Sequence, residues 1–279
     1  MDFKKTVAIH YTEFTPSERK ICARILEDPQ IVNNSIVVLG DLCETSKSAI
    51  LRFYQKLGYR GYSEFKYSVE ESFKNNDEKK LSNESLLSQI SQEYSNTILE
   101  LGALDYDHQL KELASLIDKY PHVLSIGINN TYFAASQLEY SLYSHNRFIQ
   151  SVREDIYLTY LINSIHQDYF CIIYSVSGST YTYENFIKEA SAKGAKIVLI
   201  TIDGNSELLP LVDLAFVLPS ISLPISSIDS IIQIDNRIML YYFSEIISYY
   251  YGLNTQNYKC YDNIAFLIYI NLFVISSSL

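Results

Sequence analysis

Apolar side chains recur every three or four positions in two short segments near the start of the chain, which is the spacing of an amphipathic helix. The polar residues Thr45 and Ser46 separate the two segments. The pattern therefore predicts two short helices joined by a tight turn, which is the build of a helix-turn-helix unit. The apolar positions are Ile36, Leu39 and Leu42 in the first segment, and Ala49, Ile50, Phe53 and Leu57 in the second.

The predicted turn supplies a cap for the second helix and is followed by a polar helix face. Ser46 can accept a hydrogen bond from the free backbone N–H groups at the start of that helix. The side chains that project from its uncommitted face are Lys47, Ser48, Arg52 and Lys56. A second helix of this kind usually enters the major groove of DNA. Two amphipathic helices joined by a polar turn also occur in helical domains that never bind DNA, and the spacing alone leaves both possibilities open.

Glycines accompany both predicted helices. Gly58 fits the left-handed residue that ends a helix, and Gly61 permits a second sharp turn before a new helix at Ser63. Gly40 lies in the first helix, where a residue without a side chain lets a second helix approach closely. We therefore expect a compact unit with tight helix-to-helix connections.

The pattern of apolar positions changes along the rest of the chain. A helix is predicted from Ser17 to Leu26, and the wholly polar run at residues 74–80 predicts a linker. Residues 85–104 have the spacing of a long helix, and helices then alternate with short apolar strands. Such alternation predicts a parallel sheet covered on both faces. The expected strands are residues 122–128, 148–152, 169–176, 195–202 and 213–219.

Hydroxyl side chains and a glycine follow the third of these strands, just before a helix that we expect to start near Tyr183. Hydroxyls and backbone N–H groups at the start of a helix suit a phosphate, and the carboxyl ends of parallel strands are where open α/β sheets bind ligands. Many strand-to-helix connections use serine and glycine only for capping and turning, so this composition alone leaves the ligand open. The residues concerned are Ser175, Ser177, Gly178, Ser179 and Thr180.

Charge is distributed unevenly between the two parts of the chain. The net charge is −10, but residues 1–80 carry a balance of +1 and residues 81–279 a balance of −11. Attraction to DNA phosphates must therefore come from local clustering of basic residues in the first part. The hydrophobic content of 48% and the length of 279 residues suit a globular protein with two cores.

Cysteines and termini provide further expectations. The four cysteines are scattered, without the spacing of a zinc site or a disulfide framework, so we expect neither a metal nor a cofactor. No signal peptide is visible, which predicts a cytoplasmic protein. The apolar run at residues 264–275 is too short to span a bilayer as a helix. We expect it to be buried or to face a partner, with a membrane-surface anchor as the alternative.

The first part of the chain resembles the N-terminal domain of the RpiR family of bacterial transcriptional regulators. The resemblance comes from the turn, the Arg52-Phe53 pair and the glycine-containing ending Leu57-Gly58-Tyr59 with Gly61-Tyr62-Ser63-Glu64-Phe65-Lys66. Gly40 stands where the family more often has alanine. The resemblance implies binding to double-stranded operator DNA. Lys47, Ser48 and Arg52 would then face the groove, and Ser46, Lys56 and Arg60 would contact the phosphate backbone.

The second part resembles a sugar isomerase (SIS) domain, which follows the helix-turn-helix in RpiR-type regulators. The similar residues are Asp168, the loop from Ser175 to Thr180, Lys193-Gly194-Ala195 with Ile197, Ile200 and Thr201, and Ala215 with Leu218-Pro219 after Asp213. This resemblance implies a phosphosugar whose phosphate is bound by Ser175, Ser177 and Thr180, with the Ser179 backbone N–H contributing. The first loop departs from the family pattern, because Gly127-Ile128-Asn129-Asn130-Thr131 stands where Gly-x-Gly-x-Ser is common. Asn129, Asn130 and Thr131 are the expected sugar-side contacts, and Asn129 can adopt the left-handed conformation of a glycine.

The expected fold is thus an all-α helix-turn-helix domain at residues 1–76, a linker at 77–84, an α/β SIS domain with a five-stranded parallel sheet at 85–251, and a tail at 252–279. The expected function is a non-enzymatic regulator of sugar metabolism genes that responds to a phosphosugar. Two alternatives stay open: a phosphosugar isomerase, for which Glu184 or His166 would be the base, and a regulator whose SIS domain is a ligand-free scaffold.

We also expect a homodimer or higher homo-oligomer, since helix-turn-helix readers generally use two-fold symmetry. The apolar, tyrosine-rich helix at Ile238–Tyr251 offers a surface for this packing, or alternatively folds back on its own domain. The sequence identifies neither the sugar nor the sign of regulation.

Overall fold

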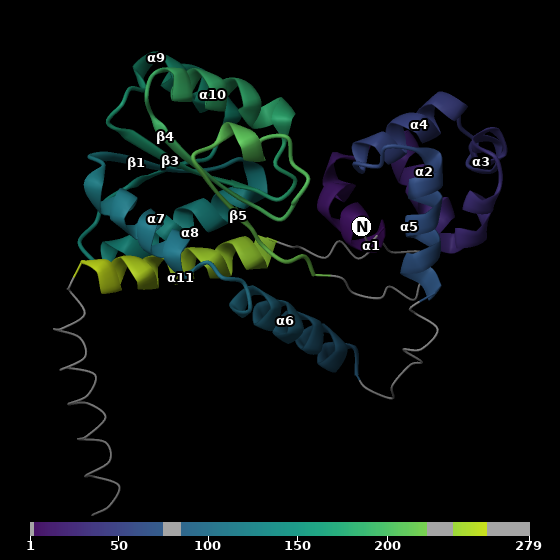
Figure 1. Ribbon diagram of the computed structural model, residues 1–279, viewed down its shortest axis with the longest axis horizontal. Coiled ribbons are helices and arrows are strands. Elements are labelled where there is room, and N and C mark those ends of the chain that lie inside the picture. Colours follow the sequence, from purple (N-terminus) through teal and green to yellow (C-terminus); the bar gives the residue numbers. More distant parts are fainter. Residues whose placement is uncertain (1–2, 75–84, 222–236, 256–279) are drawn as a thin grey trace, which may run out of the picture. The chain divides into compact units, whose positions relative to one another are not determined.

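The structure is a computed structural model that describes residues 3–74, 85–221 and 237–255. These residues form two compact units that divide mainly between Leu104 and Asp105. The first is helical and the second is built around a sheet (Figure 1). The predicted linker at 77–84 lies outside the described residues, and the predicted domain limits stay a prediction.

The helices of the first unit begin at the caps that the sequence offers. Helix α2 starts after Thr15, whose hydroxyl accepts the Glu18 N–H at 3.3 Å while the Glu18 carboxylate accepts the Thr15 N–H at 2.7 Å. Helix α2 therefore confirms the helix predicted from Ser17 to Leu26. Helix α1 was not predicted. The helices are α1 (Phe3–His10), α2 (Pro16–Glu27), α3 (Ile36–Leu42), α4 (Lys47–Lys56), α5 (Tyr62–Lys74) and α6 (Leu86–Gly102).

Aromatic side chains fill the core of this unit. Phe65 is fully buried, with its ring centroid 6.1 Å from that of Phe53 in an edge-on arrangement and 5.8 Å from that of Tyr54 in a stacked one. The Tyr62 hydroxyl donates to the Val32 carbonyl oxygen at 3.0 Å. Offset and edge-on ring pairs add to the stabilisation that burial provides, so α4 and α5 hold a fixed relative position.

The structure bears out the glycine expectations, although the bend at Gly61 has no positive φ. Gly58 has a φ of 82°, as expected for a left-handed helix end. A Cβ on Gly40 would lie 3.1 Å from the Thr45 carbonyl oxygen and 3.3 Å from the Lys47 nitrogen, so the start of α4 approaches α3 closely. Gly61 is not among the residues of positive φ and faces open space, and α5 begins directly after it. The expected bend before this helix is present at Arg60 and Gly61.

The second unit has the expected five-stranded parallel sheet with helices on both faces. Its strands are β1 (His122–Gly127), β2 (Gln150–Val152), β3 (Tyr169–Ser175), β4 (Lys196–Thr201) and β5 (Leu214–Val217), in the order β2-β1-β3-β4-β5. The helices are α7 (Asp107–Lys119), α8 (Tyr132–Tyr143), α9 (Asp155–Ser164), α10 (Thr180–Ala192) and α11 (Arg237–Asn254). Helices α9 and α10 cover one face, and α7, α8 and α11 cover the other (Figure 1). The sequence analysis did not assign α9.

Strand order defines the place where a ligand can enter. The chain runs from β1 to β2 on one side, and then returns to β3 on the other side of β1. The connections after β1 and β3 therefore leave toward opposite faces of the sheet, and a crevice opens between them at the carboxyl edge. Gly127 pairs with Tyr174 at the last register position, just before the two loops diverge.

Helix α11 has a buried face and an exposed one. Leu240, Phe243 and Ile247 are buried, and the Ser244 hydroxyl donates to the Ala134 carbonyl oxygen of α8 at 2.8 Å. This face of α11 thus packs on its own domain, which was the alternative to packing against a second copy of the chain. Tyr249, on the outer face, is 54% exposed.

The apolar run at 264–275 lies outside the described residues. None of the helices in the described ranges combines the length and the apolar content needed to cross a bilayer.

Candidate functional site

The start of α4 has the geometry that the helix-turn-helix pattern predicts. The Ser46 hydroxyl accepts the Ala49 N–H at 3.2 Å and lies 2.9 Å from the Ser48 hydroxyl. The cap satisfies one of the donors that the first turn of a helix leaves free. The predicted N-cap is therefore confirmed, and it fixes where the side chains of the first turn point.

One continuous face of α4 is exposed. Lys47, Ser48 and Arg52 all lie on it, as expected. Leu51 and Gln55 share this face and were not predicted. Leu51 follows Lys47 by four residues and Gln55 follows Ser48 by seven, and both are spacings that keep residues on one face of a helix. Within the described residues, neither Lys47 nor Arg52 forms an ion pair with a carboxylate.

Lys56 behaves differently from the other basic residues of α4. Its ammonium group lies 3.0 Å from the Glu18 carboxylate and donates to the Glu13 carbonyl oxygen at 2.7 Å. The side chain is thus bound to its own domain, and its expected contact with a DNA phosphate stays a prediction. Arg60 is exposed, and its backbone N–H donates to the Glu64 carboxylate at 2.8 Å.

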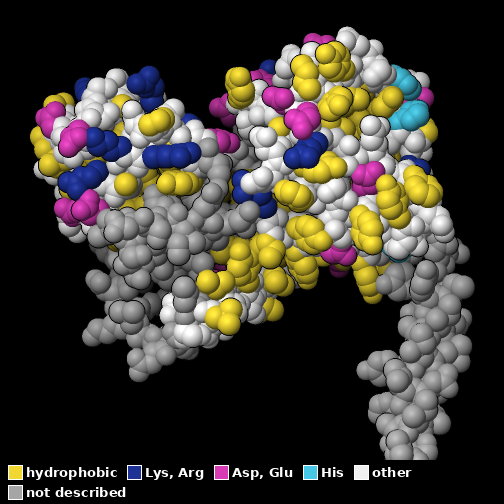
Figure 2. Space-filling model, turned by 180° about the vertical axis from the view of Figure 1, so that it is seen from behind, with side chains coloured by type: hydrophobic (Ala, Val, Ile, Leu, Met, Phe, Trp, Pro, Cys, Tyr) yellow, Lys and Arg dark blue, Asp and Glu magenta, His cyan; other side chains and the backbone are white. Residues whose placement is uncertain are grey.

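Other basic residues of this unit are paired as well. Lys20 forms an ion pair with Glu44, and Arg24 forms one with Glu27. Figure 2 accordingly shows Lys and Arg side chains interspersed with Asp and Glu over the helical unit. Within the described residues, Lys47 and Arg52 thus differ from Lys20, Arg24 and Lys56 in having no carboxylate partner.

The hydroxyl-rich loop after β3 is the second candidate site. Ser175 ends β3 and is buried, and its hydroxyl accepts the Ser179 N–H at 3.3 Å. Gly178 has a φ of 56°, a conformation that glycine adopts without strain. Ser177 and Thr180 are partly exposed. The loop thus presents hydroxyls at the positive end of a helix, which is a favourable place for an anion.

Helix α10 starts earlier than expected. It begins at Thr180, not near Tyr183, because the Ser179 hydroxyl caps it by accepting the Thr182 N–H at 3.4 Å. The predicted phosphate ligand Thr180 is therefore the first residue of the helix. The Ser179 N–H donates to the Ser175 hydroxyl at 3.3 Å, and its expected contribution to phosphate binding stays a prediction. Ser175 thereby shapes the loop.

The loop after β1 is a single tight turn. Asn129 has a φ of 57°, which confirms the left-handed conformation expected of it. Asn129 and Asn130 are exposed, whereas Thr131 is buried and its hydroxyl donates to the Ile128 carbonyl oxygen at 2.9 Å. Of the three expected sugar-side residues, the two asparagines thus have accessible side chains and Thr131 closes the turn.

Gly127 makes this turn possible. A Cβ at this position would lie 2.5 Å from the Thr131 carbonyl oxygen and 2.8 Å from the Tyr132 nitrogen. Both are backbone atoms, which cannot rotate out of the way. The sequence analysis placed Gly127 near the end of a strand, at the first position of the run that resembles the family's first loop, but did not predict this close packing.

Tyr183 joins the two loops and was not predicted. Its buried hydroxyl accepts the Ile128 N–H at 3.2 Å and donates to the Tyr174 carbonyl oxygen at 3.4 Å. Burial raises the pKa of Tyr183, so the phenol stays protonated and remains a donor. The only sign in the sequence was the position of Tyr183 on the apolar face of the predicted helix. That position indicates a buried side chain but does not identify the hydrogen-bond partner of its hydroxyl.

The two candidate bases of the isomerase alternative lie at different places in the unit, Glu184 one turn after Thr180 on α10 and His166 before β3. Glu184 forms an ion pair with Lys188 at 2.5 Å, one turn further along α10. His166 precedes the amino end of β3, at the edge of the sheet opposite Ser175, and its Nδ1 lies 3.6 Å from the Asp168 carboxylate.

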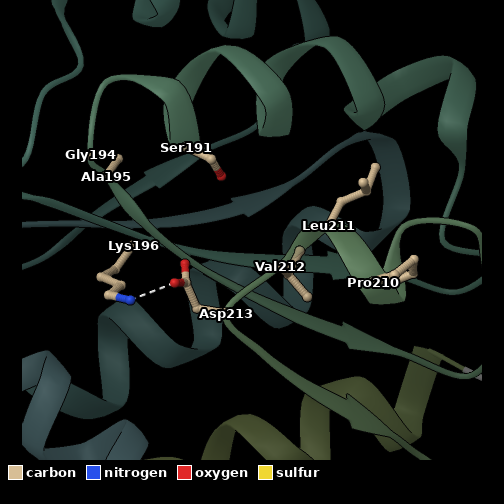
Figure 3. Close-up of a pocket in the computed structure, with 8 residues that line it drawn as sticks. All are labelled: Ser191, Gly194, Ala195, Lys196, Pro210, Leu211, Val212 and Asp213. Carbon is tan, nitrogen blue, oxygen red and sulfur yellow. Dashed lines mark hydrogen bonds and ion pairs between the residues drawn. The ribbon is translucent and has the colours of Figure 1, made fainter.

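A cavity of about 320 Å³ lies at the opposite edge of the sheet, near the amino end of β4. Figure 3 shows the Asp213 carboxylate directed at the Lys196 ammonium group, and the two are 2.5 Å apart. Asp213 also accepts the Ile197 N–H at 2.8 Å. The hydrogen bond to Asp213 raises the pKa of Lys196, and both residues line the cavity. This cavity is separate from the two loops.

The cysteines in the described residues are buried free thiols: Cys22, Cys43 and Cys171. Burial raises the pKa of Cys22 to about 12. Within the described ranges, no three His, Cys, Asp or Glu side chains come together as metal ligands would.

Comparison with known proteins identifies both units. Residues 1–76 match the helix-turn-helix domain of the rpiR family, and residues 115–232 match the SIS domain. An uncharacterised HTH-type transcriptional regulator of Providencia stuartii is 26% identical over 203 residues, which cover 69% of this chain and 72% of that protein. The HTH-type transcriptional regulator GlvR of Bacillus subtilis is 25% identical over 203 residues, which cover 72% and 77%.

A solved structure has a similar fold. The Vibrio vulnificus NanR protein complexed with ManNAc-6P superimposes with a TM-score of 0.56 at 16% identity, and covers 96% of this chain and 98% of that one.

Proposed function

Because the chain belongs to the RpiR family of transcriptional regulators, with a helix-turn-helix domain followed by a SIS domain, we propose that a phosphosugar controls its binding to operator DNA. The observation that supports this most is the pairing, at the carboxyl edge of the sheet, of a hydroxyl-lined loop at the start of α10 with the exposed asparagines after β1. One loop suits a phosphate and the other suits sugar hydroxyls. A relative of similar fold, NanR, is complexed with a phosphosugar.

In this proposal, operator DNA binds along the exposed face of α4. Lys47, Ser48 and Arg52 meet base edges, and Ser46, Lys56 and Arg60 contact the backbone. Lys56 must first leave Glu18, so its contribution is smaller than that of an unpaired lysine. Two copies of the chain would bind two half-sites, with the exposed side of α11 available for their contact. This function requires access to chromosomal DNA and hence a cytoplasmic location.

Arg52→Ala tests the DNA-binding half. The duplex is selected by the wild-type protein from a random library, and binding is measured by fluorescence anisotropy. Loss of a side chain that reads a base costs about 1–3 kcal/mol, a factor of roughly 5–150 in affinity. Arg24→Ala is the matched control, because it removes the same charge from the same unit but from a residue already paired with Glu27. Equal losses in both variants would contradict a reading role for α4.

Ser177→Ala tests the ligand-binding half. Thermal shifts are recorded with a panel of hexose and pentose phosphates, ManNAc-6P included, with the parent sugars and inorganic phosphate as controls. Ligand at about a hundred times its Kd stabilises the folded state by roughly 2.7 kcal/mol. We expect Ser177→Ala to lose this shift and to keep operator affinity. Ser164→Ala, which removes an exposed hydroxyl at the end of α9, should keep both.

No response to any phosphosugar would favour the scaffold alternative. Conversion of a bound phosphosugar to an isomer, followed by NMR, would favour the enzyme alternative. The proposal of a non-enzymatic regulator is supported by the helix-turn-helix domain, which an isomerase would not require, and by the pairing of Glu184 with Lys188.

A further inference from the structure

Tyr183 occupies the point at which strands β1 and β3 separate. The ladder between them ends at the pair Gly127 and Tyr174. The next donor on β1 is the Ile128 N–H, and the acceptor facing it is the Tyr174 carbonyl oxygen. The Tyr183 hydroxyl accepts from the first at 3.2 Å and donates to the second at 3.4 Å, so it replaces the ladder hydrogen bond that is lost where the loops diverge.

The same hydroxyl fixes the start of the asparagine-bearing turn. Ile128 is held at both of its backbone polar groups, since its carbonyl oxygen accepts from the Thr131 hydroxyl at 2.9 Å. Asn129 follows directly, in the left-handed conformation that turns the chain back toward α8. The direction of the Asn129 and Asn130 side chains therefore depends on where Ile128 is held.

Tyr183 itself cannot touch a ligand in this arrangement, because its side chain is 2% exposed. It comes from α10, the helix whose first residue is Thr180 in the phosphate-side loop. One helix thus carries both a phosphate-side hydroxyl, that of Thr180, and the group that holds the sugar-side turn.

We infer that Tyr183 is a positioning residue that sets the distance between the two halves of the proposed phosphosugar site, and thereby its preference for a phosphosugar over free phosphate. The inference rests on the proposed function. It goes further by naming the residue that couples sugar recognition to phosphate recognition. Two subsites held at a fixed spacing bind a ligand that spans both without the cost of ordering one of them.

The test compares Tyr183→Phe with Tyr174→Phe in the full-length chain. Both remove one buried phenolic hydroxyl from the same unit. The Tyr174 hydroxyl bonds to Ser244 at 2.9 Å on the α11 side of the sheet, and Ser244 keeps the Ala134 carbonyl as a partner without it. Titration calorimetry gives the Kd of inorganic phosphate and of whichever phosphosugar in the panel binds the wild type most tightly.

We expect Tyr183→Phe to reduce the preference for that phosphosugar over phosphate by about tenfold, the effect of one hydrogen-bonded contact, while the Kd for phosphate changes less than about threefold. Tyr174→Phe should leave the preference unchanged. General destabilisation would lower the melting temperature without changing the ratio of the two Kd values. An unchanged preference in Tyr183→Phe, beside a wild type that binds the phosphosugar, overturns the inference alone. A wild type that binds no phosphosugar overturns the proposed function and this inference with it.

A measurement on the wild type covers the case in which Tyr183→Phe fails to fold. Amide exchange resolved by NMR should show the Ile128 N–H exchanging as slowly as that of Ile126 inside β1, because the Tyr183 hydroxyl holds it. Exchange as fast as that of the exposed Asn130 would overturn the inference.

Discussion

Replacing Gly127 by alanine tests how tightly the turn after β1 is closed. The new Cβ would lie 2.5 and 2.6 Å from the Thr131 carbonyl oxygen and carbon, and 2.8 Å from the Tyr132 nitrogen. Real Cβ atoms essentially never approach other atoms this closely, and no side-chain rotation relieves a contact with backbone. The turn must therefore move away from the strand, and the hydrogen bond from the Ile128 N–H to Tyr183 is strained with it.

Overpacking of a well-packed site costs about 1–3 kcal/mol, and a clash with backbone belongs at the upper end of that range. For a domain of 150–250 residues each kcal/mol lowers the melting temperature by about 2–4 °C. A cost of about 2–3 kcal/mol therefore predicts a decrease of roughly 4–12 °C. Differential scanning calorimetry of the full chain measures it, and the affinity for phosphosugars should fall as the asparagines shift.

Gly204→Ala is the matched control. A Cβ there would meet only Val217 Cγ1 at 3.5 Å, an ordinary van der Waals contact, and Gly204 is not among the residues of positive φ. This variant should melt at the wild-type temperature or slightly above it, because alanine restricts the unfolded chain. If Gly127→Ala melts within about 1 °C of Gly204→Ala, a difference well below the shift expected from overpacking, the close packing of the turn is refuted.

Three further predictions concern caps, pH and thiols. Ser46→Ala should lower the free energy of unfolding by about 0.5–2 kcal/mol in urea denaturation, and Ser46→Gly by only a few tenths, because the N-cap hydroxyl bond is lost. Burial alone would raise the pKa of Glu18, but hydrogen bonds from Thr15 and Lys56 outweigh it and lower this pKa below its ordinary value of 4.5. The stability that the ionised Glu18 carboxylate contributes is therefore fully present above that pH and is lost as the pH falls through its lowered pKa. Melting curves of Glu18→Gln should lack this contribution to the pH dependence. Iodoacetamide at pH 8 should leave Cys22 and Cys171 unmodified in the native protein, since burial raises the pKa of both thiols; mass spectrometry showing rapid labelling would contradict their burial.

The sequence predicted the features that depend on local periodicity and capping. Helix α4 begins after Ser46, where the capping hydroxyl and the first apolar positions of the helix both predict a helix start. The five strands are recognisable as short apolar runs. The serine-rich loop was harder to predict, because Ser175, Ser177 and Ser179 are all possible caps. Only the folded backbone selects Ser179 and moves the start of α10 to Thr180.

Contacts between distant segments were beyond the reach of periodicity. The pairing of Lys56 with Glu18 joins residues 38 positions apart, and nothing in the pattern of α4 distinguishes Lys56 from Arg52. The bond from Ile128 to Tyr183 spans 55 positions and depends on strand order. Gly127 reads as an ordinary strand residue until the path of the turn is known. The site was therefore predictable in its loops and unpredictable in the groups that hold them together.

The neutralised flanks of the helical unit have a kinetic consequence. Lys20, Arg24 and Lys56 each have a carboxylate partner, so duplex phosphates attract them less than they attract Lys47 and Arg52. If α4 binds DNA as proposed, a collision with DNA would be favoured in one orientation, with α4 toward the groove. Loosely held complexes on non-target sequence would then already present the reading face as the protein slides along the duplex. Charge placement in this domain would thus shorten the search for an operator as well as stabilise the final complex.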